Sequence, residues 1–146
     1  EKTSKHLFDK KSIINRCVKF SAGYQGVDIN EWNGFLTPEQ TRVRNSSEYS
    51  DWRNKVFSRD NYTCQCCGSR SHKDNPVELH AHHIENFAHN EDLRFDVDNG
   101  ITLCKNCHDI RIDGSFHNVY GVHNNNRLQL EEYMSKIENT NKKGNE

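Results

Sequence analysis

Two closely spaced cysteine pairs are the residues whose types and spacing most clearly could do chemistry. Two residues separate the cysteines within each pair, Cys64-x-x-Cys67 and Cys104-x-x-Cys107, and 36 residues separate the pairs. A two-residue gap lets both thiolates face one ion, and four such sulfurs make a closed structural zinc site. Two disulfides are the alternative, which a compartment that keeps thiols reduced disfavours. Cys17 and Cys66 are left over as small buried or idle thiols.

Histidines and an asparagine follow one another around the cysteine pairs in the order His, Asn, His. His82-His83 lies between the pairs, Asn99-Gly100 precedes the second pair, and His108 follows Cys107 directly. This order, combined with the cysteine spacing, resembles the HNH endonuclease family, especially its phage-encoded members. The motifs that carry the resemblance, within about 48–137, are Tyr49-x-x-Trp52-Arg53, Ala81-His82-His83-Ile84, Leu93-Arg94-Phe95, Asn99-Gly100-Ile101-Thr102-Leu103-Cys104, Cys107-His108 and Phe116-His117-x-x-Tyr120-Gly121.

The resemblance implies a role for each residue of the His-Asn-His set. His83 would be the general base, since an imidazole with a pKa of about 6.5 is largely neutral at pH 7 and can take a proton from water. His82 and His108 would hold one catalytic divalent cation on the scissile phosphate. Asn99 would orient the base or its loop. Many family members have aspartate at the position of His82, and a neutral imidazole there lets Mn²⁺, Ni²⁺ or Zn²⁺ compete with Mg²⁺.

The implied fold is an α+β, zinc-stapled ββα-metal (HNH) domain with flanking helices, and local patterns place its elements. A helix is expected over 47–59, capped by Ser46 or Ser47, with Trp52 as its core anchor. Strands are expected over 77–82 and 101–103, then a helix over 107–112 and another that begins with Leu128 on its apolar face and decays from Asn139. In a regular strand His82 and His83 point to opposite faces, so the pair must sit at a bend.

We divide the chain into a lead segment with a basic arm (1–45), a nuclease core (46–122) and a C-terminal helix with a polar tail (123–146). Only 32% of the residues are apolar and the mean hydropathy is −1.04, so we expect metal ligation to supplement a small core. No run is apolar enough for a membrane span, which favours a soluble protein of the cytoplasm, that of the host cell if the protein is phage-encoded.

Charge is distributed unevenly around a net value of −1. Residues 1–20 carry six lysines and arginines against two acidic residues, a local charge of +4. Lys10 and Lys11 of this arm, with Arg53 and Arg59 of the first helix, are therefore candidate contacts to DNA phosphates. A merely solvated charged surface is the alternative for the arm.

The sequence thus predicts a metal-dependent endonuclease that cuts double-stranded DNA, by a nick or through both strands, to 5′-phosphate and 3′-hydroxyl ends. A zinc-finger module that binds nucleic acid without cutting is the alternative. It would need the four cysteines but has no reason to keep His83, Asn99 and His108 in register. For His80 and His117 we expect packing or hydrogen-bonding roles, although either could reach the cation.

Overall fold

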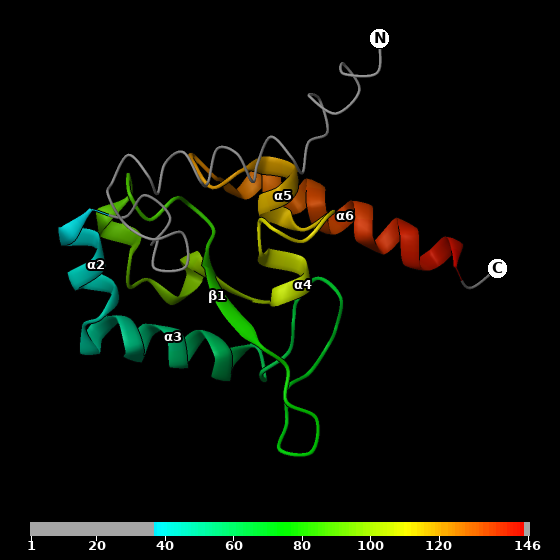
Figure 1. The fold of residues 1–146 in the computed structure, drawn as a ribbon, viewed down its shortest axis with the longest axis horizontal. Coiled ribbons are helices and arrows are strands. Elements are labelled where there is room, and N and C mark those ends of the chain that lie inside the picture. Colours follow the sequence, from blue (N-terminus) through cyan, green and yellow to red (C-terminus); the bar gives the residue numbers. More distant parts are fainter. Residues whose placement is uncertain (1–36, 145–146) are drawn as a thin grey trace, which may run out of the picture. The chain divides into compact units, whose positions relative to one another are not determined.

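The computed structural model describes residues 37–144 (Figure 1). The chain divides at Val43 into two units, and the site lies in the second, Val43–Glu146. The basic arm with Lys10 and Lys11, and Cys17, lie outside the described residues. The elements in chain order are the helices α2 (Pro38–Arg44) and α3 (Ser47–Arg59), strand β1 (Leu79–His83), the 3₁₀ turns η2 (Glu91–Leu93) and η3 (Val97–Asn99), strand β2 (Gly100–Cys104), and the helices α4 (Lys105–His108), α5 (Phe116–Tyr120) and α6 (Arg127–Lys143).

Helix α3 has the bounds that its sequence predicts, because both of its ends are chemically marked. The Ser46 side chain caps it by accepting from the Tyr49 amide at 3.2 Å. The chain reverses after Asp60 through two residues with left-handed backbone angles, Asn61 and Tyr62. The face between these ends buries Trp52, which is 2% exposed, and Val56. The predicted anchor role of Trp52 is confirmed.

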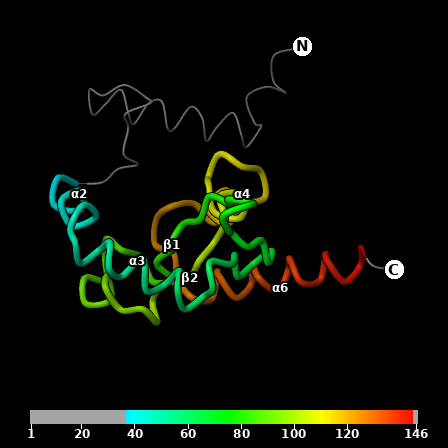
Figure 2. Tube along the Cα trace, turned by 90° about the horizontal axis from the view of Figure 1, so that it is seen from below, coloured from blue at the N-terminus to red at the C-terminus, as the bar shows by residue number. Residues whose placement is uncertain are grey.

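The sheet is an antiparallel hairpin of two strands, β1 and β2. The predicted strand over 77–82 is shifted, since β1 begins at Leu79 and ends at His83. The register pairs His82 with Ile101 and His83 with Gly100, so the histidine pair stands at the end of the strand. Figures 1 and 2 show this hairpin between α3 on one side and the α5–α6 pair on the other.

The predicted helix over 107–112 is wrong in both position and length. Helix α4 is a single turn that begins directly after β2 and ends at His108, because Asp109 adopts an extended conformation. The Ser115 hydroxyl then donates to the Asp109 carbonyl at 2.5 Å and holds a turn that leads to α5. His108 therefore stands at the end of a helix, and its ring centroid lies 4.5 Å from that of His117 in α5.

Helix α6 begins at a capping box, in which Asn126 and Gln129 satisfy each other's backbone amides. Its buried residues are Leu130 and Tyr133, whereas Leu128 is 77% exposed, so the prediction that Leu128 belongs to the apolar face is wrong. The helix also continues through the predicted polar tail to Lys143, where basic residues complement the helix dipole. None of the helices in residues 37–144 is both long and apolar enough to cross a membrane.

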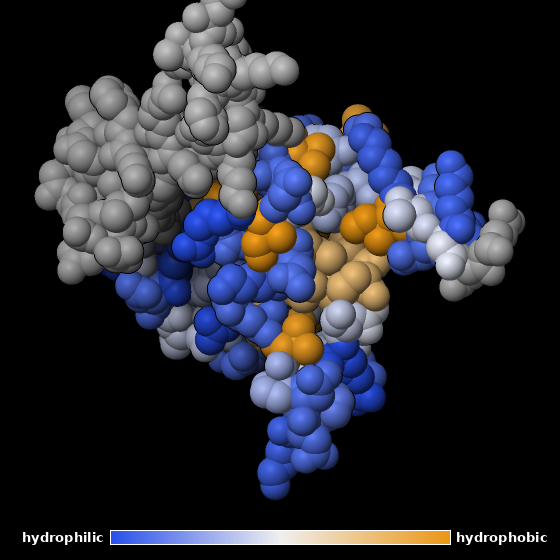
Figure 3. Space-filling view, turned by 45° about the vertical axis from the view of Figure 1, so that its right-hand side comes forward, coloured by the Kyte–Doolittle hydropathy of each residue, from blue (hydrophilic) through white to orange (hydrophobic). Residues whose placement is uncertain are grey.

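The apolar core is divided into two small clusters. One contains Cys64, Leu103, Cys104 and Cys107, and the other contains Ile84, Phe116, Leu130 and Tyr133. On the face shown in Figure 3, hydrophilic residues predominate and hydrophobic ones form separate small patches. Three of the four residues of the first cluster are cysteines, so this part of the core depends on what the sulfurs bind.

Helix α3 lies close to the hairpin at Gly100. A Cβ atom there would lie 2.5 Å from Val56 Cγ2 and 2.8 Å from Trp52 Cζ2. The Trp52 indole also donates to the Asp96 carbonyl at 2.8 Å, just before η3. The glycine is therefore required for close approach.

Replacing Gly100 with alanine should destabilise the domain by roughly 1–3 kcal/mol, because the added methyl overpacks this contact. Urea unfolding measures the loss. The double variant with Val56→Ala should lose less stability than the sum of the losses in the two single variants, because Val56→Ala removes the methyl that the new Cβ would contact. Strict additivity would show that the Gly100–Val56 contact does not limit packing.

A second junction joins the end of α3 to the start of β2 through Arg59 and Asp60. The Arg59 guanidinium donates to both Asp60 carboxylate oxygens and to the carbonyls of Val97 and Gly100, at 2.6–2.9 Å. Asp60 also accepts from the Thr102 amide at 2.9 Å. Burial alone would raise the pKa of Asp60, but the hydrogen bonds from Arg59 and Thr102 outweigh it and lower this pKa below its usual value of 3.8.

Because the pKa of Asp60 is lower in the folded state, its carboxylate stabilises the fold above the unfolded pKa, and this contribution is lost as the pH falls through the folded pKa. Asp60→Asn should therefore cost roughly 1–3 kcal/mol at neutral pH, and the difference from the parent should shrink below about pH 4. Thermal melting of both proteins from pH 7 to pH 3 measures this. A difference that is constant across the range would contradict the role of the carboxylate charge.

Candidate active site and metal centre

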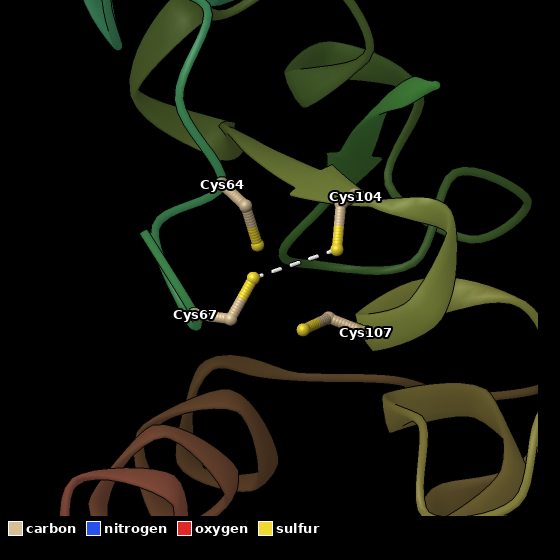
Figure 4. A group of neighbouring side chains, drawn as sticks. All are labelled: Cys64, Cys67, Cys104 and Cys107. Atoms are coloured by element: carbon tan, nitrogen blue, oxygen red, sulfur yellow. Dashed lines mark hydrogen bonds between the residues drawn. The ribbon is translucent and has the colours of Figure 1, made fainter. Parts of the chain in front are cut away.

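Four cysteine side chains converge on one point between the hairpin and the preceding loop (Figure 4). Cys64 and Cys67 come from the turn closed by Gly68, which has a left-handed φ of 78°, and Cys104 and Cys107 come from the end of β2 and from α4. All four sulfurs lie within 4.8 Å of one another, and those of Cys67 and Cys104 are 3.6 Å apart. A tetrahedral zinc site with bonds of about 2.3 Å has sulfurs about 3.8 Å apart. The geometry fits such an ion, and the five described cysteines are free of disulfides.

Electrostatics gives a second reason why this cluster suits a cation. Hydrogen bonds from the thiols of Cys107 and Cys66 lower the pKa of Cys64. The pKa of Cys107 is raised, first by that hydrogen bond and then by burial, and burial raises the pKa of Cys104. Without a cation, one thiolate therefore suppresses ionisation of its neighbours. A divalent ion removes this conflict and allows four thiolates to coexist.

Three imidazoles form a second candidate metal centre on another part of the hairpin. They are His82 of β1, His108 at the end of α4 and His117 of α5, and their ring nitrogens lie within 4.8 Å of one another. The Nε2 atoms of His108 and His117 are 3.2 Å apart, and Nε2 of His82 is buried without a hydrogen-bond partner. Three imidazole nitrogens that converge in this way, one of them without any hydrogen-bond partner, are a suitable donor set for a divalent cation.

The protonation states of these three histidines suit metal binding. Burial lowers the pKa of His82 well below 6.5 and that of His108 to about 3, with further lowering by neighbouring imidazoles, and burial also lowers the pKa of His117. All three rings are therefore neutral at neutral pH, the form that binds metals. The Gly121 carbonyl accepts a hydrogen from Nδ1 of His117 at 2.7 Å, which leaves Nε2 of His117 with its lone pair toward the cluster.

His83 lies on the opposite face of β1 from His82. The bend expected at the histidine pair is absent, because both residues pair with β2 in regular register. Its ring stacks on Trp52 with centroids 4.0 Å apart and planes inclined by 15°. Its Nε2 atom is 2.9 Å from the Arg94 carbonyl oxygen, which can only accept, so Nε2 carries the hydrogen and the lone pair is on Nδ1. Burial lowers the pKa of His83 to about 4, partly opposed by that hydrogen bond. The structure brings His82 and His108 together but directs His83 away from them.

The Asn99 amide fixes the connection between the strands. Its oxygen accepts from the Glu85 amide at 2.8 Å, and its nitrogen donates to the carbonyls of Glu85 and Leu93 at 3.2 and 3.3 Å. Leu93 precedes Arg94, whose carbonyl holds His83. Asn99, 4% exposed, is thus placed to position the loop that orients the imidazole.

The other residues singled out in the sequence have different surroundings. Arg53 is exposed on α3, whereas the guanidinium of Arg59 already makes the four hydrogen bonds of the α3–β2 junction, so any DNA contact by Arg59 would compete with them. Both DNA contacts stay predictions. His80 lies 3.1 Å from a Glu78 carboxylate oxygen. A packing or hydrogen-bonding role was expected for His117, but its ring lies with those of His82 and His108. Its position in the Phe116-His117 motif was the available signal.

Comparison with known protein families gives a match that covers the residues of both candidate metal centres up to His108. Residues 64–113 match the model of the HNH endonuclease family. The chain therefore contains an HNH domain. The match, about a third of the chain, includes both cysteine pairs, the His82-His83 pair, Asn99 and His108, and ends before His117. The hairpin followed by α4 fits the ββα-metal fold. No curated protein and no solved structure matched the chain.

Replacing Cys104 with serine should release the metal of the HNH domain and leave it largely unfolded, because structural zinc supplies roughly 10–16 kcal/mol to small metal-folded domains. Bound zinc per chain and the melting temperature are measured together. Cys66→Ser is the matched control, since Cys66 lies beside the cluster but is not one of its four sulfurs. A Cys104→Ser protein that lacks zinc and melts like the parent would contradict a structural role for the metal.

Proposed function

We propose that this protein is a metal-dependent HNH endonuclease that hydrolyses phosphodiester bonds of double-stranded DNA to 5′-phosphate and 3′-hydroxyl ends. The observation that carries the proposal is the cluster of three neutral imidazoles on one face of β1, next to an oriented imidazole on the other face. The match of residues 64–113 to a nuclease family supports DNA as the substrate. A module that only binds nucleic acid gains nothing from such a set of histidines.

The two metal centres would have separate tasks. The four cysteines would hold zinc, which joins the turn that carries Cys64 and Cys67 (the first knuckle) to β2 and α4. His82, His108 and His117 would hold the catalytic cation, and three nitrogen donors without a carboxylate favour Mn²⁺, Ni²⁺ or Zn²⁺ alongside Mg²⁺ more than a site with aspartate does. A divalent cation at such a site supplies positive charge to the scissile phosphate and to the departing oxygen.

The task of His83 is to take a proton from the attacking water. The Arg94 carbonyl fixes the tautomer, so that Nδ1 offers the lone pair. His83 is 7% exposed, so the base is largely shielded from bulk water. After proton transfer, the Nε2 hydrogen bond to Arg94 still stabilises the imidazolium. Stacking on Trp52 prevents the ring from rotating away.

The placement of the histidine pair restricts where the substrate lies. His83 is the last residue of β1, so the two faces of the strand meet beside it. A phosphate at this end of the strand could be reached by water activated at His83 and by the centre built on His82. Asn99 would act as a positioning residue, since its amide fixes the loop that carries the Arg94 carbonyl. Arg53, exposed on α3, would contact the DNA backbone.

Nicking of supercoiled plasmid, combined with direct measurement of Mn²⁺ binding to the zinc-loaded protein, tests this proposal. His83→Ala should keep zinc, Mn²⁺ affinity and DNA affinity while cleavage falls by roughly 10²–10⁴. His117→Ala should lower Mn²⁺ affinity, and high Mn²⁺ should restore part of its cleavage. His72→Ala is the matched control, because His72 is exposed on the loop before β1.

Three outcomes would overturn parts of this assignment. Near-parental cleavage by His83→Ala would remove its role as the base. Unchanged Mn²⁺ affinity in His117→Ala would remove His117 from the metal site. Tight DNA binding by the parent, with no cleavage under Mg²⁺, Mn²⁺ or Ni²⁺, would favour the alternative of a non-catalytic zinc-finger module.

A further inference from the structure

Arg44, the last residue of α2, is a partly buried cation that the proposed chemistry does not use. No carboxylate of the described residues lies within salt-bridge distance of it, whereas Arg59 pairs with Asp60 and Arg111 with Asp109. Its Nε atom is buried without a hydrogen-bond partner. Removing an arginine partly from water without an anion is unfavourable, so its position requires an explanation.

Aromatic residues hold the guanidinium in place. Its Nη1 donates to the Tyr49 hydroxyl at 3.1 Å, and its carbon lies 4.3 Å from the Phe87 ring centroid. A second guanidinium, that of Arg94, lies 4.2 Å from the centroid of the same ring. Two guanidinium groups on one phenyl ring concentrate positive charge, and the fixed plane of Arg44 costs little further entropy when it binds.

This charge lies beside the proposed base. The two rings that hold Arg44 also contact His83, with centroid distances of 6.0 Å from Tyr49 and 5.1 Å from Phe87. Arg44 is therefore held close to the proposed base by two rings that contact both residues.

We propose that Arg44 binds a phosphate of the DNA backbone at the cleavage site, through a guanidinium that the Tyr49 hydroxyl and the Phe87 ring hold ready beside His83. The proposal rests on the proposed nuclease function and names a substrate-binding residue for it. The planar donors of arginine match two phosphate oxygens, which a lysine ammonium does not. The bound phosphate supplies the anion that residues 37–144 do not provide to Arg44.

Two measurements test the role of Arg44. Binding to a DNA duplex is measured against salt concentration in the His83→Ala background without added Mg²⁺ or Mn²⁺, so that no cleavage occurs. Arg44→Gln should reduce the slope of log K against log salt by about 0.9, the value for one phosphate contact. In the otherwise parental chain, Arg44→Gln should reduce kcat/KM for plasmid nicking by roughly 10- to 100-fold, in line with one charged contact of about 1.5–3 kcal/mol.

Two further variants separate the effect of the Arg44 guanidinium group from the effect of positive charge alone. Arg70→Gln is the matched control, because it removes the same charge from an exposed side chain whose partner is Asn61. Arg44→Lys should keep the parental salt slope but still lose at least fivefold in kcat/KM. If Arg44→Gln melts below the assay temperature, Arg44→Lys alone tests whether the guanidinium binds the phosphate. Cleavage by Arg44→Lys equal to that of the parent would overturn the proposal.

The outcomes also distinguish this proposal from the nuclease proposal itself. If the parent does not cut DNA but Arg44→Gln lowers the salt slope and Arg70→Gln does not, the nuclease function fails and the phosphate contact stands. If the parent cuts DNA and Arg44→Gln behaves like Arg70→Gln in both assays, the phosphate contact fails and the nuclease function stands.

Discussion

The convergence of four cysteine sulfurs is the constraint on which the rest of the HNH domain depends. The first knuckle, β2 and α4 each contribute to it, and three of the four residues in one of the two core clusters are cysteines. Apolar burial alone is small in a chain that is 28% charged. Because His108 directly follows Cys107, the sulfur cluster also positions one imidazole of the second centre. A single metal-binding event would therefore stabilise the fold and place part of the chemistry.

The pleat of β1 separates the candidate imidazole centre from His83, the proposed base. His82 points toward α4 and α5, where His108 and His117 complete a set of three rings, whereas His83 points toward α3 and stacks on Trp52. Each face has its own supports: the Gly121 carbonyl orients His117, and the Arg94 carbonyl orients His83. Because the two sets of contacts involve different residues, we expect mutation to change metal affinity and proton transfer separately. Asn99 fixes the loop between the strands through its hydrogen bonds to Glu85 and Leu93. Gly100 lets α3 pack closely against the hairpin.

Much of this arrangement follows from local sequence signals. Ser46 and Asp60 mark the ends of α3, the spacing of the cysteine pairs predicts their cluster, and alternation along β1 predicts that His82 and His83 diverge. The missed features depend on tertiary contacts. Helix α4 ends at His108 because the Ser115 hydroxyl holds the following turn. The Arg59 guanidinium donates to carbonyls of η3 and β2, about 40 residues away in sequence. His117 joins the metal cluster only because that same turn brings α5 beside α4. Spacing along the chain does not encode these contacts, and composition gives no sign of them.

X-ray absorption at two metal edges tests the central claim most directly, namely that sulfur and imidazole ligands form two separate centres. The protein is loaded with one equivalent of zinc and then with one equivalent of Co²⁺. We predict that the zinc edge will report four sulfur ligands at about 2.3 Å, and that the cobalt edge will report only nitrogen and oxygen ligands, with imidazole scattering, at about 2.1 Å. Sulfur at the cobalt edge, imidazole at the zinc edge, or failure to bind the second ion would contradict the account.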